Sequence, residues 1–403
     1  MSDSDRLLGV WRRHGRRWHA ALCVLCVGLV LALVVLGSVV AAMVRSGNEN
    51  LEAKWAAVLR DHHAGFVVTP LEDWYFTRAQ PARGGRPAGL NRIPGVALST
   101  VPPSPDAPAS APVAATAAAP VGHLTAPRDI SLIVQPPLAN EGKWLPAGPT
   151  VGGSPGMYIA QFRADSEFTG QITTAAWIDP TLLRVRLVPG ANEPGGTWSV
   201  PPAITGDALR HIVAAFNGGF RFKEAQGGFH FDGRDAVPLR EGAASISIAN
   251  DGHIDIGKWG SDVRMAHDTE AVLQNLNLLV DNGRVDPAVS HNDTRSWGFT
   301  LRGTIAVARS GIGVTADGAL VYVAGPALSA RALAQSLQRA GAVRAMTLDL
   351  NPEWVTFNLF SHPDPSNPMV VKGAKLFPQM SRPADRYLST ESRDYFTVSL
   401  RDG

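Results

Sequence analysis

The feature that most constrains this chain is the apolar segment from Ala20 to Val44, which contains no charged residue. A transmembrane helix needs about 20 consecutive apolar residues, so the segment predicts one membrane span. Five arginines precede it, namely Arg6, Arg12, Arg13, Arg16 and Arg17. By the positive-inside rule, residues 1–19 form a cytoplasmic tail and the chain after the span is extracytoplasmic. The sequence therefore predicts a single-pass membrane protein with an uncleaved signal anchor at residues 20–44.

The alternative to an anchor is a cleaved signal peptide, since Ser38-Val39-Val40-Ala41 weakly resembles a cleavage site. Both cysteines of the chain, Cys23 and Cys26, lie inside the apolar segment. Their spacing is typical of redox or metal sites, but the apolar surroundings favour membrane-facing or acylated thiols. The part of the chain beyond the span has no cysteine. It must therefore fold on its hydrophobic core without disulfides.

Composition divides the rest of the chain into three parts. Residues 45–78 form a juxtamembrane segment of helical composition, with the helix expected at Leu51–His63. Residues 79–127 form a linker in which 23 of 49 residues are alanine or proline, too little apolar surface for a folded core. Residues 128–403 form the folded domain. The formal net charge of +2 gives no polybasic signal for nucleic acid.

The folded domain is predicted to be α+β, mixed and strand-rich. Short runs of β-branched and apolar residues between turn residues predict its strands. The expected strands are 157–163, 173–178, 182–188, 212–216, 245–249, 253–257, 276–280, 303–308, 319–323, 345–350 and 394–400. One helix is clearly indicated, because Ser329 can cap it, Leu333 and Leu337 fall one turn apart, and Gly341 can end it.

Asp349 is the most unusual residue of the domain, because it lies in an apolar strand. A charge in such a place is unfavourable unless it is paired, hydrogen-bonded or used in chemistry. Asn351-Pro352 ends the strand and puts Asp349 near its C-terminal mouth, where open α/β sheets commonly bind ligands. The alternative is that Asp349 caps or bonds a neighbouring loop, since a perturbed carboxylate is only a probabilistic pointer to function.

Three further segments carry candidate site residues. In the first, Asn217-Gly218-Gly219-Phe220, the glycines allow a ligand to approach and the asparagine amide can donate and accept hydrogen bonds. In the second, His230 alternates with two phenylalanines and has a ring suited to general acid or base chemistry. In the third, Arg309-Ser310-Gly311-Ile312-Gly313, the guanidinium can bind phosphate or carboxylate. The alternative for the first segment is a plain turn. His230 could instead be a solvent-facing strand residue, and Arg309 could form a surface ion pair.

In this order the segments resemble the phosphodiester glycosidase family. That family shows Asn-Gly-Gly-Phe-Phe, then Arg-Thr-Ala-x-Gly with a following Asp-Gly, then Gly-Ala leading into Asn-Leu-Asp-Gly-Gly-Gly-Ser. The matching residues here are Asn217-Gly218-Gly219-Phe220, Arg309-Ser310-Gly311-Ile312-Gly313, Asp317-Gly318, Gly341-Ala342 and Leu348-Asp349. The family's glycine-rich loop is replaced by Leu350-Asn351-Pro352-Glu353-Trp354, in which the proline removes one backbone donor.

The resemblance implies hydrolysis of a glycosyl phosphodiester at the sugar carbon, through a transition state of oxocarbenium character. It implies that Asp349 is the catalytic carboxylate, either as a base or as a stabiliser of positive charge. Arg309 would hold the phosphate, and Asn217 the sugar hydroxyls or the phosphate. His230 and Glu353 are candidates for the remaining acid/base role. The residues expected to bind substrate are Gly218, Gly219, Asn351 and Trp354, the last by stacking on a sugar.

The predicted partners are the membrane, through the N-terminal helix, and a glycan or sugar-phosphate polymer of the cell envelope. No cofactor and no metal is expected, since the sequence shows no metal-ligand motif of fixed spacing. Two other functions stay open. One is a non-catalytic, membrane-tethered binder of wall or capsular polymer that uses the same cleft, and the other is an assembly factor for polysaccharide export.

Overall fold

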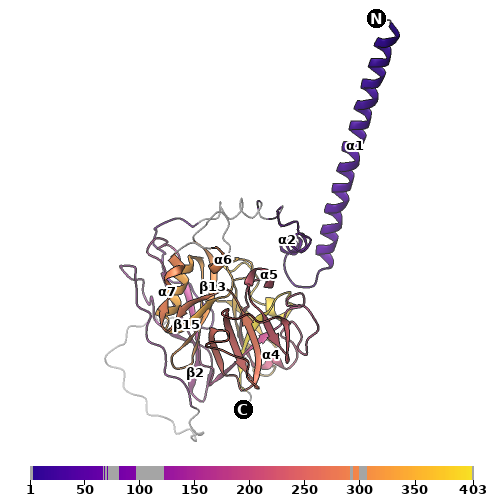
Figure 1. The fold of residues 1–403 in the computed structure, drawn as a ribbon. Helices are drawn as coiled ribbons and strands as arrows, with labels where there is room; N and C mark the ends of the chain where they lie inside the picture. Colours follow the sequence, from indigo (N-terminus) through magenta and orange to yellow (C-terminus); the bar gives the residue numbers. More distant parts are fainter. Residues whose placement is uncertain are drawn as a thin grey trace, which may run out of the picture. The chain divides into compact units, whose positions relative to one another are not determined.

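The computed structural model describes residues 3–66, 68, 70, 81–96, 122–290, 294–298 and 306–401. The chain divides into two compact units. The first comprises Met1–Arg45 and Glu49–Glu72, and the second comprises Ser46–Asn48 and Asp73–Gly403. Helices make up the first unit, whereas the second is rich in strands (Figure 1).

The first unit contains helices α1 (Asp3–Val44) and α2 (Leu51–Asp61). The part of α1 from Val24 to Val44 contains an 18-residue window with a mean hydropathy of 2.9 and no buried residue, so its length and composition allow it to cross a membrane. The N-cap of α2 is Asn50, whose side chain accepts a hydrogen bond from Ala53 N at 2.8 Å. The apolar helix predicted from the sequence is present, while its insertion and orientation in a membrane stay predictions.

The second unit contains three antiparallel sheets among the described residues. The eight-stranded sheet has, in spatial order, β1 (Leu145–Val151), β2 (Ser154–Phe162), β3 (Thr173–Ile178), β14 (Leu320–Leu328), β13 (Val307–Thr315), β15 (Ala342–Thr347), β11 (Leu278–Asp281) and β12 (Arg284–Val285). One five-stranded sheet has β17 (Lys372–Lys375), β16 (Phe357–Ser361), β5 (Ile212–Asn217), β18 (Tyr395–Leu400) and β4 (Leu183–Val188). The other has β7 (Arg234–Val237), β6 (Phe229–Phe231), β10 (Thr269–Gln274), β8 (Ala244–Ala249) and β9 (Ile254–Lys258).

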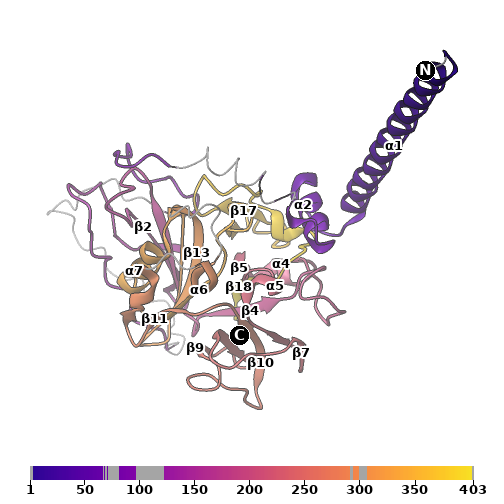
Figure 2. The same cartoon turned by 45° about the horizontal axis from the view of Figure 1, so that its top comes forward.

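Short helices connect these strands in the described part of the domain. They are α4 (Ala208–His211), α5 (Phe222–Ala225), η1 (Pro287–Ser290), α6 (Thr294–Trp297) and η3 (Arg386–Leu388). Figure 2 shows the sheet of β7, β9 and β10 next to β4 and β18, on the side away from β17.

The longest helix of the domain, α7 (Ala330–Arg339), connects β14 to β15 and covers the eight-stranded sheet (Figure 1). Its N-cap is Ser329, whose Oγ accepts a hydrogen bond from Ala332 N at 3.0 Å. Leu333 and Leu337 are buried against the sheet. Because β13 lies between β14 and β15 and is antiparallel to both, this crossover does not belong to a doubly wound parallel sheet.

The strand-rich, mixed class predicted from the sequence agrees with this architecture. Thr173–Ile178 has the predicted bounds, and α7 lies between the predicted capping residues. The strand expected at 303–308 instead runs from Val307 to Thr315, and the one expected at 345–350 ends at Thr347. The glycines after Arg309 are poor strand formers in isolation, and pairing with strands on both sides overrides that preference. Residues 303–305 lie outside the described residues.

An aromatic cluster in the main core holds two sheets together. Phe216 of β5 contacts Tyr322 of β14, Phe357 of β16 and Phe396 of β18, with ring centroids 5.2, 5.5 and 5.0 Å apart. All four side chains are buried. Packing of this density fixes the end of β5 against β14. The next residue after Phe216 is Asn217, so the cluster also fixes the position of the first predicted site residue.

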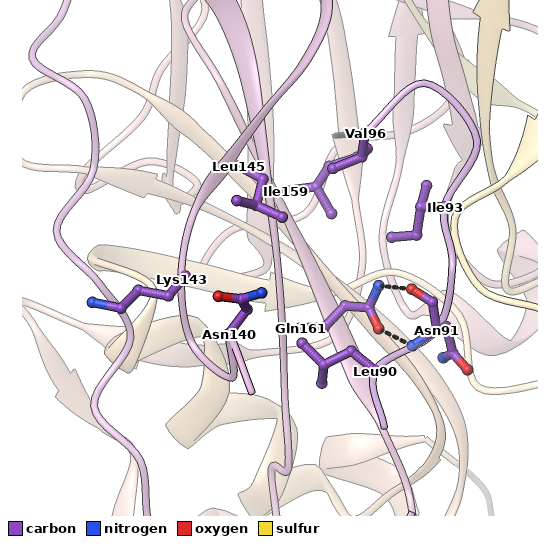
Figure 3. A pocket seen from close by; sticks show the side chains of 9 residues that line it. All are labelled: Leu90, Asn91, Ile93, Val96, Asn140, Lys143, Leu145, Ile159 and Gln161. Atoms are coloured by element: carbon purple, nitrogen blue, oxygen red, sulfur yellow. Dashed lines mark hydrogen bonds between the residues drawn. The ribbon is translucent and has the colours of Figure 1, made fainter. Parts of the chain in front are cut away.

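Part of the predicted linker at 79–127 packs on the domain (Figure 3). The side chain of Gln161 in β2 donates to Asn91 O and accepts from Asn91 N, both at 2.8 Å. Ile93 is 3 % exposed and belongs to the main core, and Val96 forms a β-bridge with Ala147. Residues 81–96 are therefore bound to the domain by specific hydrogen bonds and apolar burial. Residues 97–121 lie outside the described residues.

Candidate active site

Asn217, the last residue of β5, lies where the five-stranded sheet of β5 and β18 meets the eight-stranded sheet. Its Nδ2 donates to Gly218 O at 2.8 Å and to Ser310 Oγ at 3.0 Å. Its Oδ1 accepts from Tyr322 OH at 3.0 Å and from Thr356 N at 3.2 Å. The amide is buried and its hydrogen-bonding capacity is used inside the protein. Asn217 therefore orients the segments around the site.

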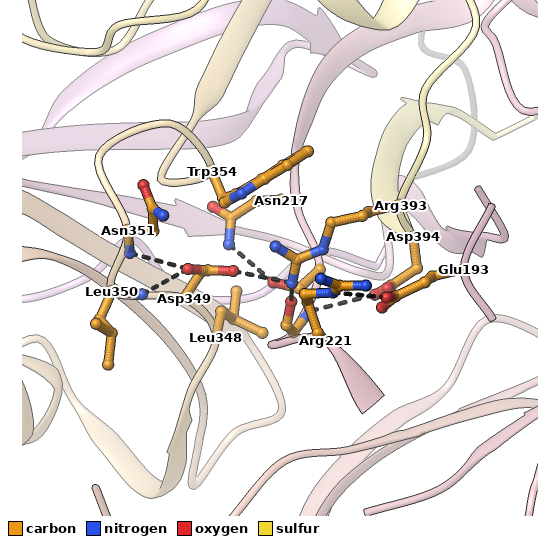
Figure 4. Close-up of polar contacts among 12 residues, drawn as sticks. Glu193, Asn217, Arg221, Leu348, Asp349, Leu350, Asn351, Trp354, Arg393 and Asp394 are labelled. Carbon is orange, nitrogen blue, oxygen red and sulfur yellow. Dashed lines mark hydrogen bonds and ion pairs between the residues drawn. The ribbon is translucent and has the colours of Figure 1, made fainter. Parts of the chain in front are cut away.

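Ser310 of β13 joins Asn217 to Asp349. Its Oγ accepts from Asn217 Nδ2, as above, and from Asp349 N at 3.2 Å. Its backbone N donates to Asp349 O at 2.7 Å. Figure 4 shows the Asn217 and Asp349 side chains close to each other below Trp354. The structure thus brings together two of the three principal residues that the sequence motifs singled out.

The carboxylate of Asp349 is 2 % exposed and is bound through both oxygens. Oδ1 accepts from Leu350 N at 2.8 Å and from Asn351 N at 2.9 Å. Oδ2 forms an ion pair with Arg393 at 3.0 Å. Burial raises the pKa of Asp349 to about 6, although Arg393 and the two amides favour the ionised form. A carboxyl group that titrates near neutral pH is suited to acid–base chemistry.

Arg393 is the cation beside Asp349. The same guanidinium nitrogen that meets Asp349 also donates to Gly219 O. The guanidinium lies over the ring of Trp354, 4.5 Å from the ring centroid. Its Nε is buried and has no hydrogen-bond partner among the described residues. Arg393 lies two residues before β18, so the pairing of β18 with β5 delivers it to the end of β5.

Asp394 is a second buried carboxylate, and Figure 4 shows Arg393 between it and Asp349. Oδ2 of Asp394 accepts from Gly219 N at 3.2 Å. Oδ1 is buried and has no hydrogen-bond partner in the described part of the chain. Burial raises the pKa of Asp394 to about 7, and the charge of Arg393 limits the rise.

Asp394 explains why the first motif contains a glycine at position 218. A Cβ on Gly218 would lie 1.8 Å from Asp394 Oδ2, whereas a Cβ on Gly219 would have Asn275 Nδ2 as its nearest neighbour, at 3.5 Å. We expect Gly218→Ala to destabilise the domain by about 2–3 kcal/mol and Gly219→Ala by less than about 1 kcal/mol. Urea unfolding of the two variants measures the difference. Equal effects would contradict the placement of Asp394 against Gly218.

Arg309 points away from Asp349, because neighbouring side chains on a strand alternate in direction and Ser310 faces Asn217. Its Nε donates to Leu328 O at 2.9 Å and its NH1 to Trp297 O at 3.0 Å. Burial lowers the pKa of Arg309 to about 10. No hydrogen bond or ion pair between described residues joins Arg309 to Asp349. The guanidinium that lies beside Asp349 belongs to Arg393.

Asn351 and Trp354 lie at the site, in contacts other than those expected. Asn351 contributes its backbone N–H to Asp349, while its side-chain Oδ1 accepts from Glu353 N at 2.9 Å. Trp354 has the guanidinium of Arg393 over its ring, and two more at 5.5 and 5.8 Å from the centroid. These cations compete for the ring faces that a sugar would stack on.

The two candidates for the remaining acid/base role, His230 and Glu353, form polar contacts with residues other than Asp349. Glu353 forms an ion pair with Arg382 at 3.0 Å. His230 lies in β6, and its Nδ1 is 2.6 Å from Asp235 Oδ1 of β7. Within the described ranges, no polar contact joins either side chain to Asp349. The remaining acid/base role therefore has a better placed candidate in Asp394.

Sequence reasoning missed Arg393, Asp394 and Asn275. Asn275 is buried, donates to Thr347 O at 3.0 Å and to Leu348 O at 2.7 Å, and leaves its Oδ1 without a partner among the described residues. The available signal was the pair of opposite charges, Arg393-Asp394, at the start of the strand predicted at 394–400. No cluster of three or more His, Cys, Asp or Glu side chains in the described residues is placed to hold a metal.

Residues 210–349, about a third of the chain, match the sequence profile of the phosphodiester glycosidase family. The resemblance predicted from the motifs is thereby confirmed over those residues. No curated protein matches the chain. One similar solved structure is the catalytic domain of zebrafish N-acetylglucosamine-1-phosphodiester alpha-N-acetylglucosaminidase, auto-inhibited by its pro-peptide. The sequence identity is 15% and the TM-score is 0.39, and the match covers 61% of this chain and 82% of that chain. A hypothetical protein from Synechocystis is similar at 14% identity, with a TM-score of 0.35 and 64% of each chain covered.

Proposed function

We propose that this protein is a hydrolase of glycosyl phosphodiesters, anchored in the membrane by α1 with its domain outside the cytoplasm. The observation that carries the proposal is the buried Asp349 carboxylate, paired with Arg393 at 3.0 Å. Asp349 lies at the end of the segment that matches the phosphodiester glycosidase family. A buried carboxylate next to a cation suits a reaction in which a sugar carbon becomes positive and a phosphate becomes more negative.

In the proposed reaction, the bond between the anomeric carbon and the phosphate oxygen breaks. Asp349 acts as the base for the attacking water or stabilises the positive charge on the sugar ring. Arg393, whose Nε has no partner among the described residues, stabilises the departing phosphate. Asn217 keeps Ser310 and Gly218 in place around the reacting groups.

Three buried oxygen atoms near Asp349 support a substrate rich in hydroxyl groups. Asn275 Oδ1, Asp394 Oδ1 and Thr347 Oγ1 have no hydrogen-bond partner among the described residues. Buried polar atoms are normally satisfied, so atoms left open near one site suggest a ligand that completes them. Sugar hydroxyls supply such donors. We propose a cell-envelope polysaccharide with glycosyl phosphodiester links as the substrate, since α1 would keep the domain at the cell surface.

One observation favours a second function, a membrane-tethered binder of the same polymer. The amides of Leu350 and Asn351 stand where the family has its glycine-rich loop, and both point to Asp349 Oδ1. Pro352 has no N–H to offer. These amides are therefore not free to bind a phosphate, which would weaken catalysis while leaving a polar site for a glycan.

Product analysis and calorimetry on the purified protein separate the two functions. A defined oligosaccharide linked through a glycosyl phosphodiester is incubated with the protein, and free reducing sugar and phosphate monoester are measured. A hydrolase releases the two products in equal amounts. Heat of binding without product over a long incubation would contradict the hydrolase and favour the binder. Asp207→Asn, a change at an exposed carboxylate, serves as the control for protein handling.

A further inference from the structure

Two buried carboxylates lie near one guanidinium at this site, and the guanidinium forms its ion pair with Asp349. Arg393 pairs with Asp349 Oδ2 at 3.0 Å and also donates to Gly219 O, while Gly219 N donates to Asp394 Oδ2 at 3.2 Å. Gly219 thus links the cation to the second carboxylate. Two ionised carboxylates beside a single cation leave an uncompensated buried negative charge, which is strongly unfavourable. The pair is therefore expected to retain one proton.

The hydrogen bonds show which carboxylate keeps that proton. Asp349 receives two backbone N–H donors and the guanidinium, all of which favour its ionised form. Asp394 receives the N–H of Gly219 and a smaller contribution from its own backbone N–H, and its Oδ1 has no donor among the described residues. A buried carboxyl oxygen that receives no hydrogen bond is more stable in the protonated form than in the ionised form. The two environments favour different protonation states, so one carboxyl group can act as an acid and the other as a base in the same site.

We propose that Asp394 is the general acid of the site and holds the proton while Asp349 is ionised. This inference rests on the proposed function, because the general acid acts on the substrate of the proposed hydrolysis. Which carboxyl group holds the proton can be tested without substrate turnover. The sequence left the remaining acid/base role to His230 or Glu353. The proposal assigns this role to Asp394, which lies outside the segment that matches the family.

The charged groups around the pair support this assignment. Asp394 faces Arg393 on its own segment and Glu193 from the loop after β4, and Glu193 is paired with Arg221 at 2.9 Å. Asp349 faces Arg393 and is also influenced by Glu224 of α5, and its own charge helps to raise the pKa of Tyr322 of β14. Burial raises the pKa of Asp349 to about 6 and that of Asp394 to about 7. The order of the two agrees with the order of their hydrogen bonds.

In the proposed step, one proton leaves Asp394 and another reaches Asp349. The proton of Asp394 moves to the phosphate oxygen as the bond between that oxygen and the anomeric carbon breaks. A water molecule adds its oxygen to the anomeric carbon, and its proton passes to the Asp349 carboxylate. Exchange with solvent returns the proton to Asp394. The leaving phosphate monoester has a second pKa near 6, so transfer of the proton from an acid that titrates near 7 is unfavourable by only about tenfold.

The first test compares the pH dependence of kcat/KM in the wild-type protein and in Asp394→Asn. Asp349 must be ionised and Asp394 protonated, so wild-type activity falls below about pH 6 and above about pH 7. Asp394→Asn is expected to lower kcat/KM by about 100-fold and to remove the loss of activity at alkaline pH. A variant that keeps this alkaline loss, at a rate within about threefold of wild type, would overturn the proposal. Asp207→Asn is the matched control and should match wild type.

Infrared spectroscopy tests the proton independently of catalysis. At pH 6.5, between the pKa values of about 6 and about 7, the wild-type protein is expected to show the C=O band of a protonated, buried carboxyl group, and Asp394→Asn is expected to lose most of it. If Asp394→Asn does not fold, the spectrum of Asp349→Asn tests the assignment instead. The band persists in Asp349→Asn if Asp394 holds the proton. Disappearance of the band in Asp349→Asn, or its persistence in Asp394→Asn, overturns the assignment. A wild-type protein that shows the band but releases no sugar would refute the proposed function and leave the proton assignment in place.

Discussion

Replacing Asp349 with asparagine is expected to lower the release of sugar from a glycosyl phosphodiester by about 1000-fold. Asparagine has nearly the same shape, and its oxygen can still accept from the amides of Leu350 and Asn351. It has no negative charge and cannot take a proton from water. The change therefore removes the chemistry of the carboxylate while keeping the local backbone hydrogen bonds.

The measurement is the initial rate of sugar release at pH 6.5, between the pKa values of about 6 and about 7 of the two carboxyl groups. Circular dichroism of the same samples verifies that the variant is folded. Asp207→Asn, which alters an exposed carboxylate paired with Arg210, should stay within twofold of wild type. A rate for Asp349→Asn within tenfold of wild type would show that Asp349 is not the catalytic carboxylate.

The second large effect is expected for Arg393→Met, which removes the ion-pair partner of Asp349 and a cation whose charge also acts on Asp394. Breaking a buried ion pair from one side leaves an uncompensated charge and typically destabilises a protein by about 3–5 kcal/mol. The folded-state pKa values of both carboxyl groups already lie above their unfolded values and would rise further without the guanidinium. The folded protein then binds more protons than the unfolded chain, so stability falls as pH rises from about 4 upward.

Thermal unfolding of Arg393→Met and wild type at pH 5 and pH 8 measures this effect. The variant is expected to lose about 10 °C in melting temperature at pH 8 and clearly less at pH 5, where both carboxyl groups can be protonated. Arg210→Met is the matched control, because Arg210 forms only an exposed ion pair with Asp207. An equal loss for Arg393→Met at both pH values would contradict the placement of its guanidinium between two carboxylates.

Local features of the sequence predicted much of the secondary structure for identifiable reasons. Ser329 supplies an N-cap and Gly341 follows the end of α7 with φ of 101°, so the bounds of this helix follow from its own residues. Asp349 stood out because a charge in an apolar strand needs a partner, and the structure supplies Arg393. The partner itself could not be predicted, because it reaches the site through the long-range pairing of β18 with β5.

The misplacement of Arg309 has a different cause, because the predicted strand ended at residue 308 and the alternation of side chains along 309–313 could not be applied. Within Arg309-Ser310-Gly311-Ile312-Gly313, the glycines lie on the side of β13 that α7 covers. A Cβ on Gly311 would lie 2.9 Å from Met346 O and 3.0 Å from Leu337 Cδ1. The small residues of this motif thus allow close packing of a helix on a strand, whereas Ser310 on the other face serves the site.

The central claim is that water attacks the sugar carbon of a glycosyl phosphodiester at Asp349 and Asp394. Hydrolysis in water enriched in oxygen-18, followed by mass spectrometry of both products, tests it most directly. Attack of water at the sugar carbon predicts one labelled oxygen in the released sugar, at the anomeric hydroxyl, and none in the phosphate monoester. Label in the phosphate would mean that the phosphorus–oxygen bond breaks, and would contradict the assignment of this site as a glycosidase.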